Sequence, residues 1–216
     1  MSKNSGLRRA CLYSFPPHQL GYCGPQEKKK SSMLSDFIKR RKIDERKIKD
    51  ILEKEFIVSG YYRMIAQEHK LDLFDAKVIE AYWLGNKLLD KFFETGKIIP
   101  FHLYHVIAVG SLTGRIKFDD LKRDKCRISW GKVLKINGSK VLVDYRPLLR
   151  KNSAFNLSEP ISKKADWDKN FVLQLKTGDI VSIHWNKIIE VLSKKKAEQL
   201  RNYTQLTLKK DSLNFL

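Results

Sequence analysis

The sequence predicts an α+β protein, in which an N-terminal helical domain is followed by a small OB-like β-barrel and a C-terminal helix. From Leu34 to about Glu94, apolar residues recur at spacings of three and four, which is the helical period. After the charged stretch 118–125 the pattern changes to short apolar runs separated by turn residues. About four or five such runs suit a small closed barrel better than an open sheet.

Composition places the chain among ordinary globular proteins. Its 216 residues are 42% hydrophobic and 31% charged, which is enough for one large or two small domains. There is no apolar run of about 18 residues and no apolar secretory segment near the N-terminus, so no membrane association is predicted. Three cysteines are an odd number, which favours reduced thiols and a cytoplasmic location over a disulfide framework.

The formal net charge is +19, which has two interpretations. A surplus of this size favours polyanionic partners such as RNA, DNA or acidic protein surfaces. A proteome that is rich in lysine throughout would give the same surplus without any ligand. Both interpretations stay open at this stage.

Residues 1–33 are predicted to be an irregular segment rich in cysteine, proline and glycine. Pro16 and Pro17 restrict the backbone, and glycines lie on both sides of Cys23 and permit sharp bends. Such a loop would present the Cys23 thiolate to a metal or ligand, with Gly24 in support, or would bury it against the core. The residues 26–32 that follow, with three consecutive lysines, are predicted to be a solvated linker.

The helical domain is predicted to span residues 34–120. Asp75 is the predicted N-cap of a third helix that ends at Thr95-Gly96 and carries a wide apolar face with Tyr82 and Trp83. Aromatic residues at helical spacing are most simply core residues.

His102 and His105 lie three residues apart in an apolar stretch. On a helix they would share a face and could bind one metal, whereas on a strand they would point to opposite faces. Histidines in such runs are also commonly hydrogen-bonded core residues.

The barrel with its terminal helix is predicted to span residues 124–206, followed by a tail at 207–216. Asn137-Gly138 between two apolar runs predicts a hairpin. Residues 146–167 are predicted to form a polar excursion, and Ser193 to cap the last helix. The further predicted strands are Phe171–Leu175 and Ile180–Trp185.

Several catalytic signatures are absent from the sequence. It contains no Walker loop, dinucleotide fingerprint, zincin helix or Cys-x-x-Cys pair. Nucleotide-dependent catalysis therefore has no support, and a role other than catalysis is favoured. An enzyme that pairs Cys23 or Cys126 with a histidine stays an alternative, since the sequence does not set the distances between them.

Three motifs in the second half occur in a characteristic order. They are Cys126-Arg-Ile-Ser-Trp-Gly-Lys-Val, then Gly178-Asp179-Ile-Val-Ser-Ile-His184, then the closing helix. In order and spacing this region, roughly residues 126–205, resembles the HypC family of hydrogenase assembly chaperones, which begins Cys-x-x-x-Pro-Gly-Lys-Val. Two differences are that Trp130 stands in place of the proline and that 125 residues precede the cysteine.

The resemblance implies a HypC-like barrel and a role in building the metal centre of nickel–iron hydrogenases. It implies iron, or nickel, as the metal, and a hydrogenase large subunit or maturation protein as the partner. Cys126 would be the thiolate ligand or the partner-docking residue, with His184 as a second ligand and Gly131 and Lys132 in support. Thiolate and imidazole are ligands that suit such metals.

The N-terminal part resembles an uncharacterised family that is associated with hydrogenase gene clusters, and this resemblance implies that nearly the whole chain belongs to one family of unknown function. The similarity lies in Leu20-Gly-Tyr-Cys-Gly-Pro25, in Tyr82-Trp-Leu-Gly-Asn86 and in His102-Leu-Tyr-His-Val106. The first functional hypothesis is therefore a metallochaperone or accessory protein. The alternative is a basic nucleic-acid-binding module that uses an OB-type barrel.

Overall fold

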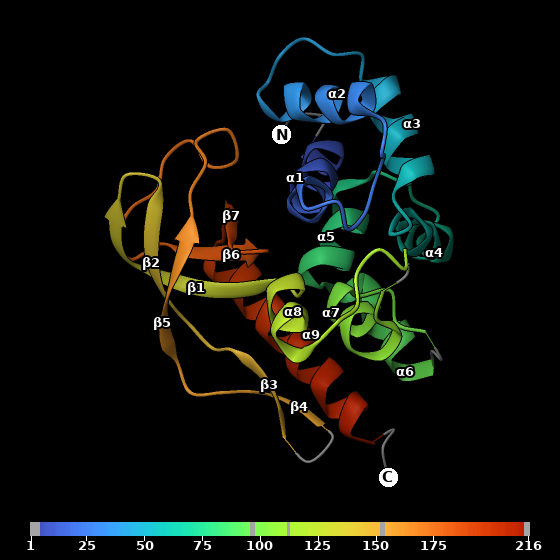
Figure 1. The fold of residues 1–216 in the computed structure, drawn as a ribbon. Helices are drawn as coiled ribbons and strands as arrows, with labels where there is room; N and C mark the ends of the chain where they lie inside the picture. Colours follow the sequence, from blue (N-terminus) through green and yellow to red (C-terminus); the bar gives the residue numbers. More distant parts are fainter. Residues whose placement is uncertain (1–4, 96–97, 112, 152–153, 214–216) are drawn as a thin grey trace. The chain divides into compact units, whose positions relative to one another are not determined.

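The computed structural model describes residues 5–95, 98–111, 113–151 and 154–213 (Figure 1). The chain divides into two compact units. The first comprises Met1–Phe101 with Ser111–Lys117, and the second comprises His102–Gly110 with Phe118–Leu216. The segment His102–Gly110 thus packs with the second unit, although it lies within the range 34–120 that was expected to form one helical domain.

The first unit is helical. The predicted N-cap Asp75 accepts a hydrogen bond from the backbone N–H of Lys77 at 2.7 Å, and Trp83 is buried as expected. The helices and 3-10 turn of this unit are α1 (Ser5–Gln19), α2 (Lys28–Ile38), α3 (Glu45–Glu55), α4 (Ser59–His69), α5 (Ala76–Leu84), η1 (Lys87–Leu89) and α6 (Asp90–Thr95).

Helix α1 differs from the irregular segment that the sequence suggested. Pro16 and Pro17 lie in its C-terminal half, where each removes one backbone hydrogen bond. Tertiary packing compensates for this loss, because Leu7, Ala10 and Tyr13 are at most 2% exposed and Tyr13 stacks on Trp83 at 5.1 Å. The predicted linker also differs, because α2 already begins at Lys28.

The predicted third helix is divided at Gly85. This residue has a φ of 81°, in the left-handed region that glycine adopts readily, and it ends α5. The chain then continues through η1 into α6, which ends at Thr95. Gly96, the other half of the predicted stop signal, lies outside the described residues.

The second unit contains the predicted barrel. Five strands close in the order β1-β2-β5-β7-β6, and β3 and β4 form a separate two-stranded sheet. In Figure 1, the long helix α9 lies beside this unit's strands. The elements of this unit are α7 (His102–Tyr104), the π-helix η2 (His105–Val109), α8 (Asp120–Cys126), β1 (Ser129–Asn137), β2 (Lys140–Tyr145), β3 (Leu148–Lys151), β4 (Ala154–Leu157), β5 (Ile161–Asp166), β6 (Ile180–His184), β7 (Lys187–Val191) and α9 (Lys194–Leu213).

The β1–β2 hairpin is present, but its turn lies one residue later than predicted. Asn137 pairs with Lys140, so the two central residues are Gly138 and Ser139. Gly138 has a φ of 58° and Ser139 does not have a positive φ, as in a type II′ turn with glycine first.

Two other strand predictions need correction. Phe171–Leu175 is a loop. Its first two residues, Phe171 and Val172, are adjacent and both buried, so the segment lacks the alternation of buried and exposed side chains that is typical of a strand. The polar excursion 146–167 instead contains β3, β4 and β5, and β7 was not predicted as a strand.

The terminal helix α9 is longer than predicted. Its cap is confirmed, since the Ser193 hydroxyl accepts a hydrogen bond from the Lys196 N–H at 3.3 Å. Neither α9 nor any other helix in the described ranges combines the length and apolar character needed to cross a membrane.

Candidate metal centre

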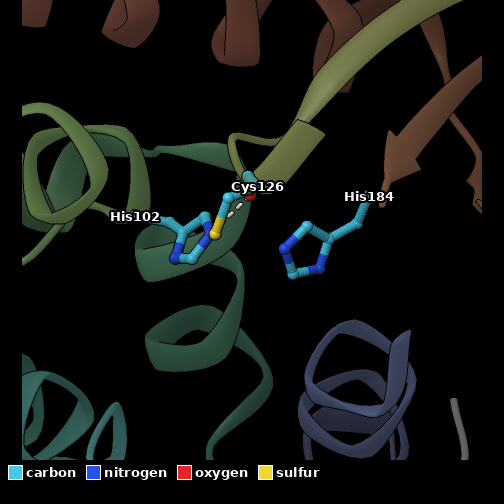
Figure 2. Close-up of side chains that lie close together, drawn as sticks. All are labelled: His102, Cys126 and His184. Carbon is cyan, nitrogen blue, oxygen red and sulfur yellow. Dashed lines mark hydrogen bonds between the residues drawn. The ribbon is translucent and has the colours of Figure 1, made fainter. Parts of the chain in front are cut away.

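Three buried side chains from separate segments of the second unit converge. Potential ligand atoms of His102, Cys126 and His184 all lie within 4.8 Å of one another. Figure 2 shows the Cys126 thiol beside the His102 ring, with the His184 ring directed toward both. The three residues are 4%, 8% and 0% exposed, so the cluster is closed to bulk solvent.

His102 opens the single helical turn α7, which continues directly into the π-helix η2. π-helices are rare in proteins, and single-turn π segments are frequently found at functional sites. Gly110, with a φ of 81°, ends it by donating its N–H to the His105 carbonyl at 2.9 Å. The two histidines are therefore on a helical segment, the arrangement in which a shared face was expected.

Cys126 is the last residue of α8, and two residues separate it from the start of β1 at Ser129. The neighbouring Asp124 and Arg127 form a buried ion pair at 3.1 Å. The Asp124 carboxylate also accepts hydrogen bonds from the Leu148 N–H at 2.8 Å and the Tyr145 hydroxyl at 3.1 Å. These contacts hold the end of α8 against the barrel and thereby set the position of the thiol.

His184 ends β6, where the chain turns back into β7. The turn residues Trp185 and Asn186 both have positive φ, 49° and 62°, as in a two-residue type I′ hairpin. The Trp185 N–H donates to the Lys125 carbonyl at 2.7 Å. This bond joins the turn to the residue before Cys126 and so brings His184 to the thiol.

Hydrogen bonding determines which ring nitrogen of His102 carries the proton. Its Nε2 lies 2.9 Å from the Cys126 carbonyl and 3.9 Å from the Cys126 sulfur. Because a carbonyl oxygen only accepts, Nε2 carries the proton in this arrangement. Burial lowers the pKa of His102 well below its usual 6.5, and the neighbouring His184 and His105 lower it further. The ring is therefore neutral at physiological pH, as metal binding requires.

His105, another of the predicted ligands, lies beside the cluster. Its ring centroid is 5.7 Å from that of His102, at an angle of 76°. Burial lowers the pKa of His105 to about 4, and a hydrogen bond to the Gly110 backbone acts in the opposite direction. His105 thus packs against His102, while the three-residue group consists of His102, Cys126 and His184.

Cys23 belongs to the first unit and has a structural environment there. Its sulfur donates to the Ser14 carbonyl at 3.9 Å, and burial raises the pKa of this thiol to about 12. Gly24 has a φ of 75°, and a side chain at this position would collide with Phe56. The nearby His18 bonds to the Cys23 carbonyl at 3.1 Å, which completes a packed loop.

Gly131 and Lys132, the predicted supporting residues in the barrel, differ in their surroundings. A Cβ at Gly131 would lie 2.9 Å from the Asp144 carbonyl, so glycine is required for β1 and β2 to approach. Lys132 is exposed on β1. Gly131 therefore has a packing role in the barrel.

The geometry suits metal coordination better than nucleophilic catalysis. Nitrogen and sulfur ligands at about 2.0–2.3 Å from one ion lie roughly 3.3–3.8 Å apart. The ligand atoms here lie within 4.8 Å of one another, so they need to approach by at most about 1.5 Å. A catalytic thiol, by contrast, has to reach its substrate, and Cys126 is 8% exposed. His102 is also a poor match for a thiolate–imidazolium pair, because its pKa is depressed.

Sequence reasoning missed the residues that hold this cluster in place. Asp124, Arg127 and the turn residues Trp185 and Asn186 were not predicted to matter. Asp124 was part of the apparent charged boundary 118–125, and Arg127 was only a position within the Cys126 motif. Burial is what distinguishes both from solvated charges. The Trp-Asn turn had no glycine, so the usual hairpin signal was missing.

In a comparison with known protein families, one family model matches nearly the whole chain. Residues 2–96 and 95–214 match the model of a family described as "Family of unknown function (DUF6390)". The chain belongs to this family. The description assigns no activity, ligand or partner, and it names neither HypC nor hydrogenases. No curated protein and no solved structure matches the chain.

Proposed function

We propose that the protein binds one iron or nickel ion through His102, Cys126 and His184, as an accessory protein or metallochaperone in nickel–iron hydrogenase assembly. The observation that carries the proposal is the convergence of these three ligand types within 4.8 Å in one unit. The HypC resemblance assigns Cys126 and His184 to a metal, and the spacing of His102 from His105 makes His102 a candidate ligand independently.

The ligand set supports this choice of metal. One thiolate and two imidazoles form a borderline-soft set that suits iron, nickel, copper and zinc, and does not suit magnesium or calcium. Three protein ligands leave a position for a further ligand, as in sites that exchange what they bind. Binding at the Nε2 of His102 would move its proton to Nδ1 and replace the hydrogen bond to the Cys126 carbonyl.

The hydrogenase role has separate support. It rests on the motif order around Cys126 and His184, and on a closed barrel followed by a helix, which is the fold that the resemblance implies. Because the cluster is closed to solvent, transfer of the metal requires local opening of the unit. A docking partner would supply the free energy for that opening.

Metal binding is tested with anaerobically purified protein titrated with Fe(II) or Ni(II), and with Zn(II) for comparison. We expect one ion per chain and a thiolate-to-metal charge-transfer band with nickel. Cys126→Ser should remove the band and weaken binding by more than the roughly 10–100-fold that loss of an outer-shell partner costs. Cys23→Ser and Cys11→Ser are matched controls, because these thiols lie in the other unit, and they should bind as wild type. Wild-type protein without bound metal would refute the site.

The hydrogenase role is tested by co-purification with hydrogenase large subunits and maturation proteins, using wild type and Cys126→Ser. We expect an association that Cys126→Ser weakens. Metal binding without any such association would leave the metal site in place and overturn the hydrogenase assignment. The two parts of the proposal thus fail separately.

A further inference from the structure

A second feature of the barrel unit is a groove of about 730 Å³ that shares no residue with the candidate metal centre. It is lined from β1, β4, α9 and the connection between β2 and β3. Strand β4 packs against α9 (Figure 1), and both elements line the groove. Its polar and aromatic lining residues are Trp130, Arg146, Asn156, Arg201, Gln205 and Lys209.

The groove is strongly cationic. Arg146, Arg201 and Lys209 line it, and no lining residue among those described is acidic. The nearest paired carboxylate, Glu159, is 3.9 Å from Arg146 and is itself 91% exposed, so solvent screens this pair. Arg201 is exposed, and its side chain makes no ion pair or hydrogen bond with any described residue. Its guanidinium is therefore available to an anionic ligand.

The remaining lining residues indicate which anion fits. Half-buried Trp130 offers an aromatic surface on which a planar base can stack, a contact worth about 1–3 kcal/mol per base. Asn156 and Gln205 carry amides that can both donate to and accept from base edges. An acidic peptide would use the cations, but its carboxylate side chains have no planar aromatic face to stack on Trp130.

We propose that this groove binds a single-stranded polynucleotide, with a base stacked on Trp130 and phosphates held by Arg146 and Arg201. The global charge of +19 raises the local concentration of such a strand. RNA and DNA share this chemistry of phosphate and planar base, and the assay below distinguishes them.

The test is fluorescence anisotropy with labelled RNA and DNA single strands of about eight nucleotides, a length within the range of one OB-type site. Each strand is titrated with full-length protein at roughly 50 and 200 mM salt. We expect binding that weakens with salt. The expected effect of Trp130→Ala is a loss of about tenfold or more, with partial retention in Trp130→Phe, which keeps an aromatic ring. Arg201→Gln should reduce the logarithmic salt slope by about 0.7, the value for one lost phosphate contact on a single strand.

Lys176→Gln is the matched control, because Lys176 is an exposed cation of the same unit outside the groove. It changes the net charge as Arg201→Gln does, and binding should stay near wild type. If Arg201→Gln and Lys176→Gln weaken binding equally, the strand is held by non-specific attraction to the net charge, and the proposed site is wrong. Failure of both strands to bind at low salt, or tighter binding of a poly-glutamate peptide, would overturn it as well. Circular dichroism of Trp130→Ala checks that the barrel is intact.

Discussion

Asp124 and Arg127 form a buried ion pair on either side of the candidate ligand Cys126. Their side chains are 6% and 1% exposed. Burial lowers the pKa of Arg127, and the Asp124 carboxylate partly offsets this effect. Such a pair contributes little net stability compared with an apolar replacement, but loss of one partner leaves the other charge buried and unpaired.

We therefore expect Asp124→Ala to lower the free energy of unfolding by about 3–5 kcal/mol. Asp119→Ala is the control on the same helix, because Asp119 is a surface N-cap of α8 that accepts from the Lys122 N–H at 2.7 Å. Its loss should cost about 1 kcal/mol. Urea denaturation of both variants measures the difference, and equal costs would show that the buried pair has no special role.

At the residue scale, the buried thiol of Cys11 also makes the stability of the folded protein depend on pH. Burial raises the pKa of this thiol from 9.0 to about 12, so the folded protein keeps its proton over a range in which the unfolded chain loses it. Stability from this group is complete below about pH 9 and is lost as the pH rises toward 12, by up to about 1.4 kcal/mol per pH unit. Cys11→Ala should show a shallower loss of stability above pH 9 in denaturation curves. An equal loss of stability with rising pH in wild type and variant would contradict the burial of this thiol.

At the scale of elements, backbone conformation decides where strands turn. Gly138 has a φ of 58° and no side-chain neighbour within 4 Å, so only its conformation disfavours a Cβ. We expect Gly138→Ala to destabilise the protein by about 1–2 kcal/mol. Gly60 in α4 also has open space, but it has a helical backbone. Gly60→Ala should therefore stabilise by about 0.5–1 kcal/mol, and the opposite signs are read from chemical denaturation.

At the scale of the whole molecule, metal binding should appear as thermal stabilisation. A ligand that binds only the folded state at about 100 times its Kd adds roughly 2.7 kcal/mol. For a chain of this size that corresponds to a rise in Tm of roughly 5–10 °C. We expect this rise with Fe(II) or Ni(II) in differential scanning calorimetry, and we expect Cys126→Ser to remove most of it. A similar rise in Cys126→Ser would place the metal elsewhere.

The sequence by itself determined the features that depend on local patterns. The helical period of residues 34–94, the Asp75 and Ser193 caps and the change to short strands near Cys126 led to the observed fold class. They succeeded because the spacing of apolar residues and the hydrogen bonds of a cap involve neighbours in the chain. The sequence also selected His102, Cys126 and His184 as candidates by residue type and motif.

Tertiary structure alone decided what distant residues do together. It made α1 helical despite two prolines, assigned His102 to the barrel unit, and separated the buried Asp124 from solvated charges nearby. It also brought the three candidate ligands together, through a backbone hydrogen bond between Trp185 and Lys125. The physical reason is that burial and long-range hydrogen bonds depend on which surfaces the folded chain brings into contact, and local periodicity carries no information about that.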